Sequence, residues 1–399
     1  MSVSSSKAVL ATDDTAKVAT RIAILGPVSA QIAFVMELTL VPVLLPSIQA
    51  DLGLSLLEIA LVFNAYSIAM AAGIVACAIG GDRFNSSQVF ALGVVLFLAG
   101  SVFIYAATDN STLIIGRVCQ GLGAGMFSPL IPVLLTQAAP RKPGRTLILW
   151  GSTAGYIAAF APLAYGTLLT EANWNLAFLF IAFVAGLSLI LVTLSQRTGK
   201  ATPSAKTSTD YTAIFRSKKL WLTFAYVFAT YGAITYFLFR VPLLLVESGK
   251  DTASVGLVLS ALWLSFSILS ALLRNLVDNH RLRLIMVSAP ILISVGLLLA
   301  FSTEILLLML SACLVGFGLA CSNSPSTQMV LRFSPTGLEA LATSIDISAA
   351  RLGGILMVTA LVDVDMRVSV GAIFVASLLA AACAHTVACP NAKSTKDQR

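Results

Sequence analysis

The sequence predicts an all-α membrane protein with twelve transmembrane helices in two pseudo-symmetric six-helix bundles. Of its 399 residues, 58% are hydrophobic and 11% are charged, whereas a soluble protein has roughly 45–50% and about 25%. The apolar residues recur in stretches of about 20, the length that crosses the hydrocarbon core of a bilayer. Two sets of six such stretches flank one polar segment. These observations exclude an ordinary soluble globular protein.

The first bundle is expected over residues 22–196, after a polar cytoplasmic tail over 1–21 that lacks the cleavage site of a signal peptide. Its spans are predicted near 22–46, 57–79, 88–107, 112–136, 146–169 and 175–195. A cytoplasmic linker over 197–219 carries six Lys and Arg residues and is typical of a flexible connection with room for a surface helix. The second bundle covers 220–388, and a cytoplasmic tail covers 389–399. Its spans are predicted near 220–246, 254–273, 284–302, 304–328, 339–362 and 368–388.

The basic residues predict the orientation of these spans. With the N-terminus in the cytoplasm, the loops and tails on that side hold 20 of the 25 Lys and Arg residues, and the opposite side holds Lys250 and Arg367. Cytoplasmic loops of membrane proteins carry such an excess, so both termini are expected inside the cell. The net charge of +7 therefore reflects membrane topology, and no nucleic-acid partner is expected.

No enzyme, metal or cofactor site is predicted. The two histidines, His280 and His385, have no nearby cysteines with zinc-ligand spacing. The sequence also lacks a phosphate-binding Gly-x-x-x-x-Gly-Lys loop, a Gly-x-Ser-x-Gly elbow and a His-Glu-x-x-His helix. Five of the cysteines lie in apolar runs, where a thiol behaves as a small hydrophobic group. We expect neither catalysis nor a disulfide framework.

The fourth span opens with a charged motif. Arg117 is followed by Gln120-Gly121 and then by small residues up to Gly125. Small residues let helices approach closely, and an arginine inside a span must find a partner, line a wet cavity or reach the membrane interface. The motif resembles the fourth-helix motif of the drug/proton antiporters of the major facilitator superfamily.

The first span carries the matching acid. Glu37, with Thr39, Leu45-Pro46 and Ile48 after it, resembles the first-helix motif of the same antiporters, with Glu for the usual Asp and Pro42 for a common Asn. An ionised carboxylate in mid-span costs roughly 2.5–3.5 kcal/mol, so it needs a cation or a proton. The first and fourth helices run in opposite directions, which places Glu37 and Arg117 in the same half of the membrane. The resemblance implies a proton carrier tuned by the arginine; a static interhelical hydrogen bond is the alternative.

The loop after the second span resembles the superfamily's signature loop. Asp82 and Arg83 match it, whereas Ala78, Asn85, Ser86 and Ser87 replace its glycines and basic residues. The resemblance implies a conformational latch, here weakened. Asp278 follows the eighth span in a degenerate copy of the loop, and this offset of nearly 200 residues supports an internal duplication.

Further charges inside the spans are Arg240, Asp346 and Arg351. Such residues are functional candidates by default, and we expect these three to bind substrate. Asp346 and Arg351 are five residues apart, which is unsuited to an i, i+4 pair. With Glu37 and Arg117 the five charges sum to +1, which favours an anionic, zwitterionic or neutral polar substrate over a simple lipophilic cation. Additional lining candidates combine polar groups with aromatic surface, although such side chains more often pack than bind: Asn64, Tyr66, Gln120, Phe127, Tyr231, Tyr236 and Asn323.

Two segments that contain proline affect the expected helix geometry and the expected direction of transport. Asn323-Ser-Pro325 is expected to interrupt the tenth span and free backbone carbonyls beside a cavity. In the fifth span, Ala161-Pro162 and Tyr165-Gly166 form a loose version of the antiporters' Gly-Pro motif. That motif accompanies exporters, so its erosion leaves the direction of transport open.

The resemblance as a whole implies a monomeric secondary active transporter in a bacterial-type inner (plasma) membrane. Its partners would be a small-molecule substrate, protons and the lipid bilayer. It would export a small organic compound, a drug or a metabolite, in exchange for protons by alternating access. The alternatives are proton-coupled or facilitated import of a small metabolite or siderophore, and a non-transporting membrane sensor.

Overall fold

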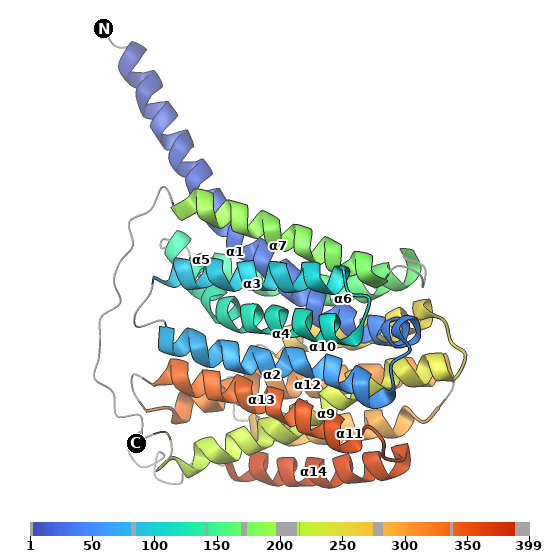
Figure 1. Ribbon diagram of the computed structural model, residues 1–399. Helices are drawn as coiled ribbons and strands as arrows, with labels where there is room; N and C mark the ends of the chain where they lie inside the picture. Colours follow the sequence, from blue (N-terminus) through green and yellow to red (C-terminus); the bar gives the residue numbers. More distant parts are fainter. Residues whose placement is uncertain are drawn as a thin grey trace, which may run out of the picture. The chain divides into compact units, whose positions relative to one another are not determined.

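The protein is helical throughout the part that its computed structural model describes (Figure 1). That part comprises residues 3–80, 85–139, 143–168, 174–196, 214, 216–273, 282–302, 304–335 and 338–387. In the first half of the sequence the elements are α1 (Val3–Leu52), α2 (Leu56–Gly80), α3 (Ser86–Tyr105), α4 (Asn110–Phe127), η1 (Ser128–Leu130), α5 (Ile131–Ala138), α6 (Pro143–Leu168) and α7 (Trp174–Gln196). In the second half they are α9 (Lys218–Glu247), α10 (Thr252–Leu273), α11 (Leu282–Leu299), α12 (Ile305–Phe333), α13 (Glu339–Leu361) and α14 (Met366–Val387).

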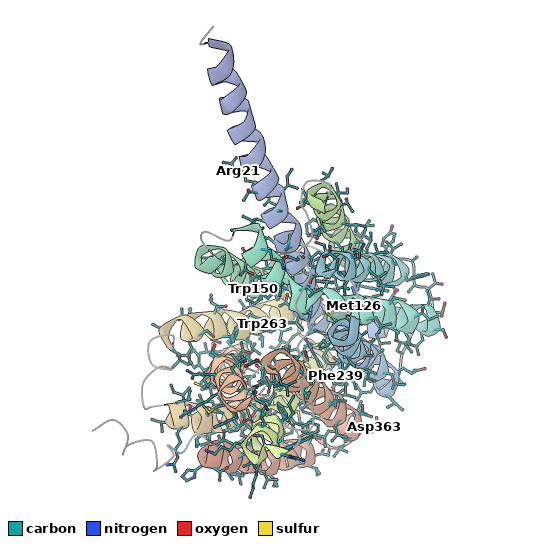
Figure 2. The ribbon with its side chains drawn as sticks, turned by 90° about the vertical axis from the view of Figure 1, so that its left-hand side faces the viewer. Arg21, Met126, Trp150, Phe239, Trp263 and Asp363 are labelled. Carbon is teal, nitrogen blue, oxygen red and sulfur yellow. The ribbon has the colours of Figure 1, made fainter. Side chains whose placement is uncertain are left out.

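The length and apolar character of these helices suit a bilayer. Within the described residues, eleven segments are long and apolar enough to cross a membrane, and α6 occupies the predicted fifth span. Long apolar side chains also point away from the helix contacts (Figure 2). Leu306, Leu284 and Phe183 are each more than two-thirds exposed. Large side chains of this kind on the outside are stable where lipid replaces water as the solvent.

Local sequence explains several helix boundaries. α1 ends just before Gly53, and Gly249 follows the end of α9; both glycines have positive φ, at 61° and 78°. That backbone conformation is a common helix stop. At the start of α4, Asp109 accepts a hydrogen bond from the Thr112 amide at 2.9 Å. This bond and a second one from the Thr112 hydroxyl hold the pKa of the Asp109 carboxyl below its usual value.

Contacts divide the chain into two compact units, and the division passes through three helices. One unit contains Met1–Leu38, Ala69–Ile157 and Asn173–Lys206. In this unit α3 packs against both α4 and α7. Glycines allow the closest approaches: a Cβ added to Gly125 would collide with the backbone of Met70 on α2, and one added to Gly123 would collide with the backbone of α3.

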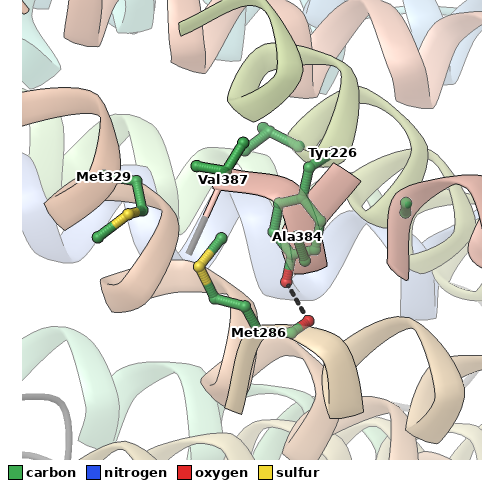
Figure 3. Packing of buried hydrophobic residues seen from close by; sticks show 7 residues of the cluster. Tyr226, Met286, Met329, Ala384 and Val387 are labelled. Carbon is green, nitrogen blue, oxygen red and sulfur yellow. Dashed lines mark hydrogen bonds between the residues drawn. The ribbon is translucent and has the colours of Figure 1, made fainter. Parts of the chain in front are cut away.

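The other unit contains Thr39–Ile68, Ala158–Ala172 and Thr207–Arg399. It therefore groups parts of α1, α2 and α6 with the helices of the second sequence half. One of its cores surrounds Tyr226, whose hydroxyl donates to the Met286 carbonyl at 3.0 Å (Figure 3). Met329, Ala384 and Val387 complete that cluster and join α9, α11, α12 and α14.

The helix pairings support the predicted duplication. In the first half, the third helix, α3, packs against the fourth and sixth helices, α4 and α7. In the second half, α11 packs in the same way against α12 and α14. Equivalent neighbours at equivalent positions are the expected result when one six-helix unit occurs twice.

Three helices differ from the sequence prediction. The predicted interruption at Pro325 is wrong, because α12 continues through it. The hydroxyls of Ser326 and Thr327 donate to the Asn323 carbonyl at 3.1 and 3.0 Å, whereas the carbonyl that loses its backbone donor at Pro325 is that of Cys321. The predicted fourth span corresponds to one candidate span, Asn110–Ala138, but the 3-10 turn η1 separates α4 from α5 within it, since Pro129 and Pro132 lack backbone donors. The helix containing the first span begins at Val3, and the candidate membrane-crossing segment within it is Thr20–Leu52.

Candidate functional site

The charged residues predicted in the first and fourth spans meet inside one unit. Arg117 Nη1 on α4 donates to Glu37 Oε1 on α1 at 2.6 Å. Glu37 is 1% exposed and Arg117 is 2% exposed. The burial of Arg117 rules out the alternative that its side chain reaches the membrane interface. A buried pair of this kind is held by charge and by hydrogen bonding together.

A polar network extends this pair to a third helix. Arg117 also donates to Gln120 Oε1 at 2.8 Å, and Gln120 lies one turn further along the same face of α4. Gln120 Nε2 donates to Ser101 Oγ on α3 at 3.0 Å, and the Ser101 hydroxyl donates to the Phe97 carbonyl at 2.8 Å. Gln120 and Ser101 are fully buried. The network therefore fixes the arginine from two sides.

The second carboxylate oxygen of Glu37 has a different environment. Oε2 is buried and has no hydrogen-bond partner within the described structure. An ionised carboxylate has acceptor capacity on both oxygens, so this one is unsatisfied. One added proton would sit on that oxygen and remove the negative charge facing Arg117. The arrangement is thus chemically able to exchange a proton and to change the strength of an interhelical contact when it does.

Three lining candidates in the other unit form two polar contacts between helices. Tyr231 on α9 donates its hydroxyl hydrogen to Asn323 Oδ1 on α12 at 2.8 Å. Asn64 on α2 donates to Thr359 Oγ1 on α13 at 2.9 Å. The first contact lies within the second half of the sequence, whereas the second connects the two halves.

The remaining intramembrane charges have unlike surroundings. Arg240 pairs with Glu247 of the same helix at 2.8 Å. Asp346 is 7% exposed, and no hydrogen bond to its Oδ1 occurs within the described residues. Arg351 is half-buried on the same helix, α13. The structure does not join Asp346 and Arg351 in an ion pair.

Three of the four aromatic candidates are buried, whereas Tyr231 is half-buried. Phe127 packs edge-on against Phe34, Phe90 and Phe97, with ring centroids 5.4 to 6.2 Å apart, which is the environment of a core residue. Tyr66 and Tyr236 are 2% and 1% exposed. All three contribute to packing.

The predicted latch cannot be compared with the structure. Asp82, Arg83 and Asp278 lie outside the described residues. Most of the predicted linker over 197–219 lies outside them too.

Three polar partners were not predicted from the sequence. Ser101 ends the network of Arg117, Thr359 holds Asn64, and Glu247 pairs with Arg240. Only Glu247 has a sequence signal, because an acid seven residues after an arginine lies two turns away on the same helix face. Within the described residues, no three His, Cys, Asp or Glu side chains gather as metal ligands.

Comparison with protein families and curated proteins agrees with this architecture. Residues 28–358 match the model of the Major Facilitator Superfamily. The chain is 33% identical over 180 residues to the puromycin resistance protein pur8 of Streptomyces alboniger, covering 43% of this chain and 35% of that protein. It is 28% identical to the tetracenomycin C resistance and export protein of Streptomyces glaucescens, covering 45% and 33%. A third relative is the drug efflux pump JefA of Mycobacterium tuberculosis, with 32% identity and coverage of 36% and 29%. The alignments thus span about a third of the relatives' length.

Solved structures share the fold over nearly the whole chain. The POT family transporter PepTSo superposes with a TM-score of 0.74 at 12% identity, covering 96% of this chain and 99% of that one. The nucleoside transporter NupG gives 0.74 at 13% identity, with coverage of 92% and 99%. A D-xylose–proton symporter gives 0.70 at 16% identity, with coverage of 92% and 95%. These similarities confirm the predicted fold class.

Proposed function

The chain belongs to the Major Facilitator Superfamily, and we propose that it is a proton-coupled transporter that exports a small organic compound by alternating access. It is a multi-pass membrane protein of a transporter family, not an enzyme. In this proposal it acts as a monomer in a bacterial-type plasma membrane, with both termini in the cytoplasm. Export of an antibiotic or similar compound is favoured by the relatives, whose names describe resistance, export and efflux.

The buried contact between Glu37 and Arg117 carries the proposal. Its ionised form joins α1 to α4 by a short charge-assisted bond, and Glu37 Oε2 has no partner within the described structure. Protonation of Glu37 would remove the charge attraction and weaken this bond. Arg117 would keep its bond to Gln120. Proton uptake and release would thereby alternate between a tight and a loosened contact of the two helices.

Such a switch couples transport to protons only if the two protonation states favour different conformations. A ligand, here the proton, shifts a conformational equilibrium by its difference in affinity for the two states. In export, the conformation open to the outside would take up a proton at Glu37, and the conformation open to the cytoplasm would release it and accept substrate. Substrate and proton would then move in opposite directions.

The test is proton movement in inside-out vesicles with an acidified interior, challenged with cationic, zwitterionic and anionic compounds that include puromycin and tetracenomycin C. The wild-type protein should dissipate the pH gradient with at least one compound class. Glu37→Gln should reduce that rate to the level of vesicles without the protein. Glu304→Gln, an exposed substitution of the same kind at the start of α12, should leave it unchanged. Full dissipation by the Glu37→Gln protein would show that Glu37 does not carry the proton.

Proton-coupled import is the second candidate. Its support is the eroded Gly-Pro motif of α6, in which Ala161 and Tyr165 stand where the exporter pattern has glycine. The same vesicles separate the two directions, because an importer of the symport type moves substrate and protons out of the acidified interior together. An exporter accumulates the compound inside the vesicle while the interior loses protons.

A further inference from the structure

The intramembrane charges of the described residues fall into satisfied and unsatisfied groups. Glu37 pairs with Arg117 at 2.6 Å, and Arg240 pairs with Glu247 at 2.8 Å. Asp346 and Arg351 have neither a salt bridge nor a side-chain hydrogen bond within the part of the chain that the structure describes. Once the paired charges cancel, one acid and one guanidinium remain.

Of these two residues, Asp346 has the larger free-energy cost as a buried charge. It is more than nine-tenths buried, and its Oδ1 meets no donor among the described residues. A buried carboxylate without a partner is strongly unfavourable, so it must take up a proton or a cation. A residue retained in this condition points to a ligand rather than to a role in packing.

Both charged residues lie close in the sequence to a residue that packs beside Tyr231. Tyr231 on α9 and Ala350 on α13 pack against the same core cluster; Arg351 follows Ala350 directly, and Asp346 lies one turn before it. The Tyr231 hydroxyl is fixed by its bond to Asn323 on α12. The acid, the guanidinium and the Tyr231–Asn323 pair therefore form one cluster built from α9, α12 and α13.

The helical geometry keeps the two charges apart. Residues five apart are separated by about 7.5 Å along a helix and by roughly 140° around it. They cannot meet as an i, i+4 pair would. Opposite charges that do not neutralise each other are complementary to a molecule that carries an ammonium and an anionic group a few bonds apart.

We propose that the cluster of Tyr231, Asn323, Asp346 and Arg351 is a binding subsite for a zwitterionic small molecule. Asp346 binds its ammonium group, and Arg351 binds its carboxylate. The Tyr231–Asn323 pair lies beside them and adds a hydrogen bond to one of the two charged groups. This assignment rests on the proposed transport of a small organic compound and names its chemical class.

A matched set of fluorescent probes tests the assignment by equilibrium titration of the purified full-length protein in detergent. Nε-dansyl-lysine is a zwitterion. Dansylcadaverine is the same molecule without the carboxylate, and Nα-acetyl-Nε-dansyl-lysine retains the carboxylate but has no ammonium group. The zwitterion should bind about tenfold or more tightly than either, because each lost charge-assisted hydrogen bond weakens binding by about that factor.

Substitutions of Asp346 and Arg351 then test which charged group of the ligand each residue binds. Asp346→Asn should remove the advantage of the zwitterion over the acetylated probe, and Arg351→Gln should remove its advantage over dansylcadaverine. Arg351→Lys should restore part of the second advantage. Asp363→Asn and Arg367→Gln are exposed matched controls that should change neither affinity nor melting temperature; Asp363 is labelled in Figure 2.

Two results would overturn the subsite. One is equal affinity of the folded protein for all three probes, or no binding of the zwitterion. The other is a preference for dansylcadaverine that Arg351→Gln does not alter, which would leave a cation site at Asp346 alone. The titration uses neither a membrane nor a pH gradient and can be repeated in Glu37→Gln. Its failure is therefore distinguishable from a failure of proton-coupled export.

Discussion

Removing the guanidinium of Arg117 would leave the Glu37 carboxylate buried without its cation. Breaking a buried ion pair from one side typically costs about 3–5 kcal/mol, because an uncompensated charge stays in a low-dielectric site. Arg117→Gln should therefore destabilise the protein strongly. The double variant Glu37→Gln/Arg117→Gln should recover much of that loss, since it buries two neutral amides.

Thermal unfolding of the four proteins of this cycle in detergent measures the coupling. A coupling energy of about 1 kcal/mol or more would identify Glu37 and Arg117 as energetic partners. Additive losses in the double variant would mean that the 2.6 Å contact contributes nothing beyond the two separate side chains.

How far the sequence predicts this site depends on helix periodicity. Arg117 and Gln120 are three residues apart, so a shared helix face follows from the sequence alone. Their approach to Glu37 follows from two motifs and from the opposite directions of two helices. Ser101 was not predictable, because periodicity defines one helix face but not which neighbouring helix faces it.

At the scale of helix pairs, the contact between α9 and α13 depends on Gly353. A Cβ at this position would collide with the carbonyl oxygen of Phe228. Small residues at membrane helix contacts permit such close approach. Gly353→Ala should therefore force the helices apart and cost about 1–3 kcal/mol, as overpacking does in other cores. The free energy of unfolding in detergent measures the loss.

Gly371→Ala on α14 is the matched control for that substitution. No atom lies within 4 Å of a Cβ built there, so the added methyl group meets open space. Alanine is also the better helix former. This variant should be neutral or slightly stabilising; an equal loss in both variants would show that the close contact with α9 does not determine the effect.

The presence of the membrane-spanning helices was predictable, because about twenty apolar residues in a row identify a span. Whether a proline interrupts such a helix was not predictable from the sequence. Pro325 and Pro129 look equivalent in the sequence, yet α12 continues through Pro325 while α4 gives way to a 3-10 turn at Pro129. The difference lies in a second proline. Pro132 follows Pro129 within one turn and removes a further backbone donor, whereas Pro325 is the only proline inside α12.

For the whole molecule, the compact unit that combines both sequence halves makes a direct prediction about the transport cycle. In this unit Asn64 of α2 bonds to Thr359 of α13, and Pro162 of α6 lies against Gly256 of α10. Alternating access requires helices of one half to move against those of the other. Contacts of this kind must therefore break in one part of the cycle.

A reversible crosslink tests this motion. The variant Asn64→Cys/Thr359→Cys is made in a background with all six native cysteines replaced. A short bifunctional methanethiosulfonate reagent can join the two new cysteines, because Asn64 Nδ2 and Thr359 Oγ1 are 2.9 Å apart in the native protein. Crosslinking should stop substrate flux in vesicles by holding α2 and α13 together, and a reductant should restore it. Each single-cysteine protein treated with the same reagent controls for modification alone. Undiminished flux in the fully crosslinked protein would show that α2 and α13 stay together throughout transport, and the moving boundary would then have to pass between other helices.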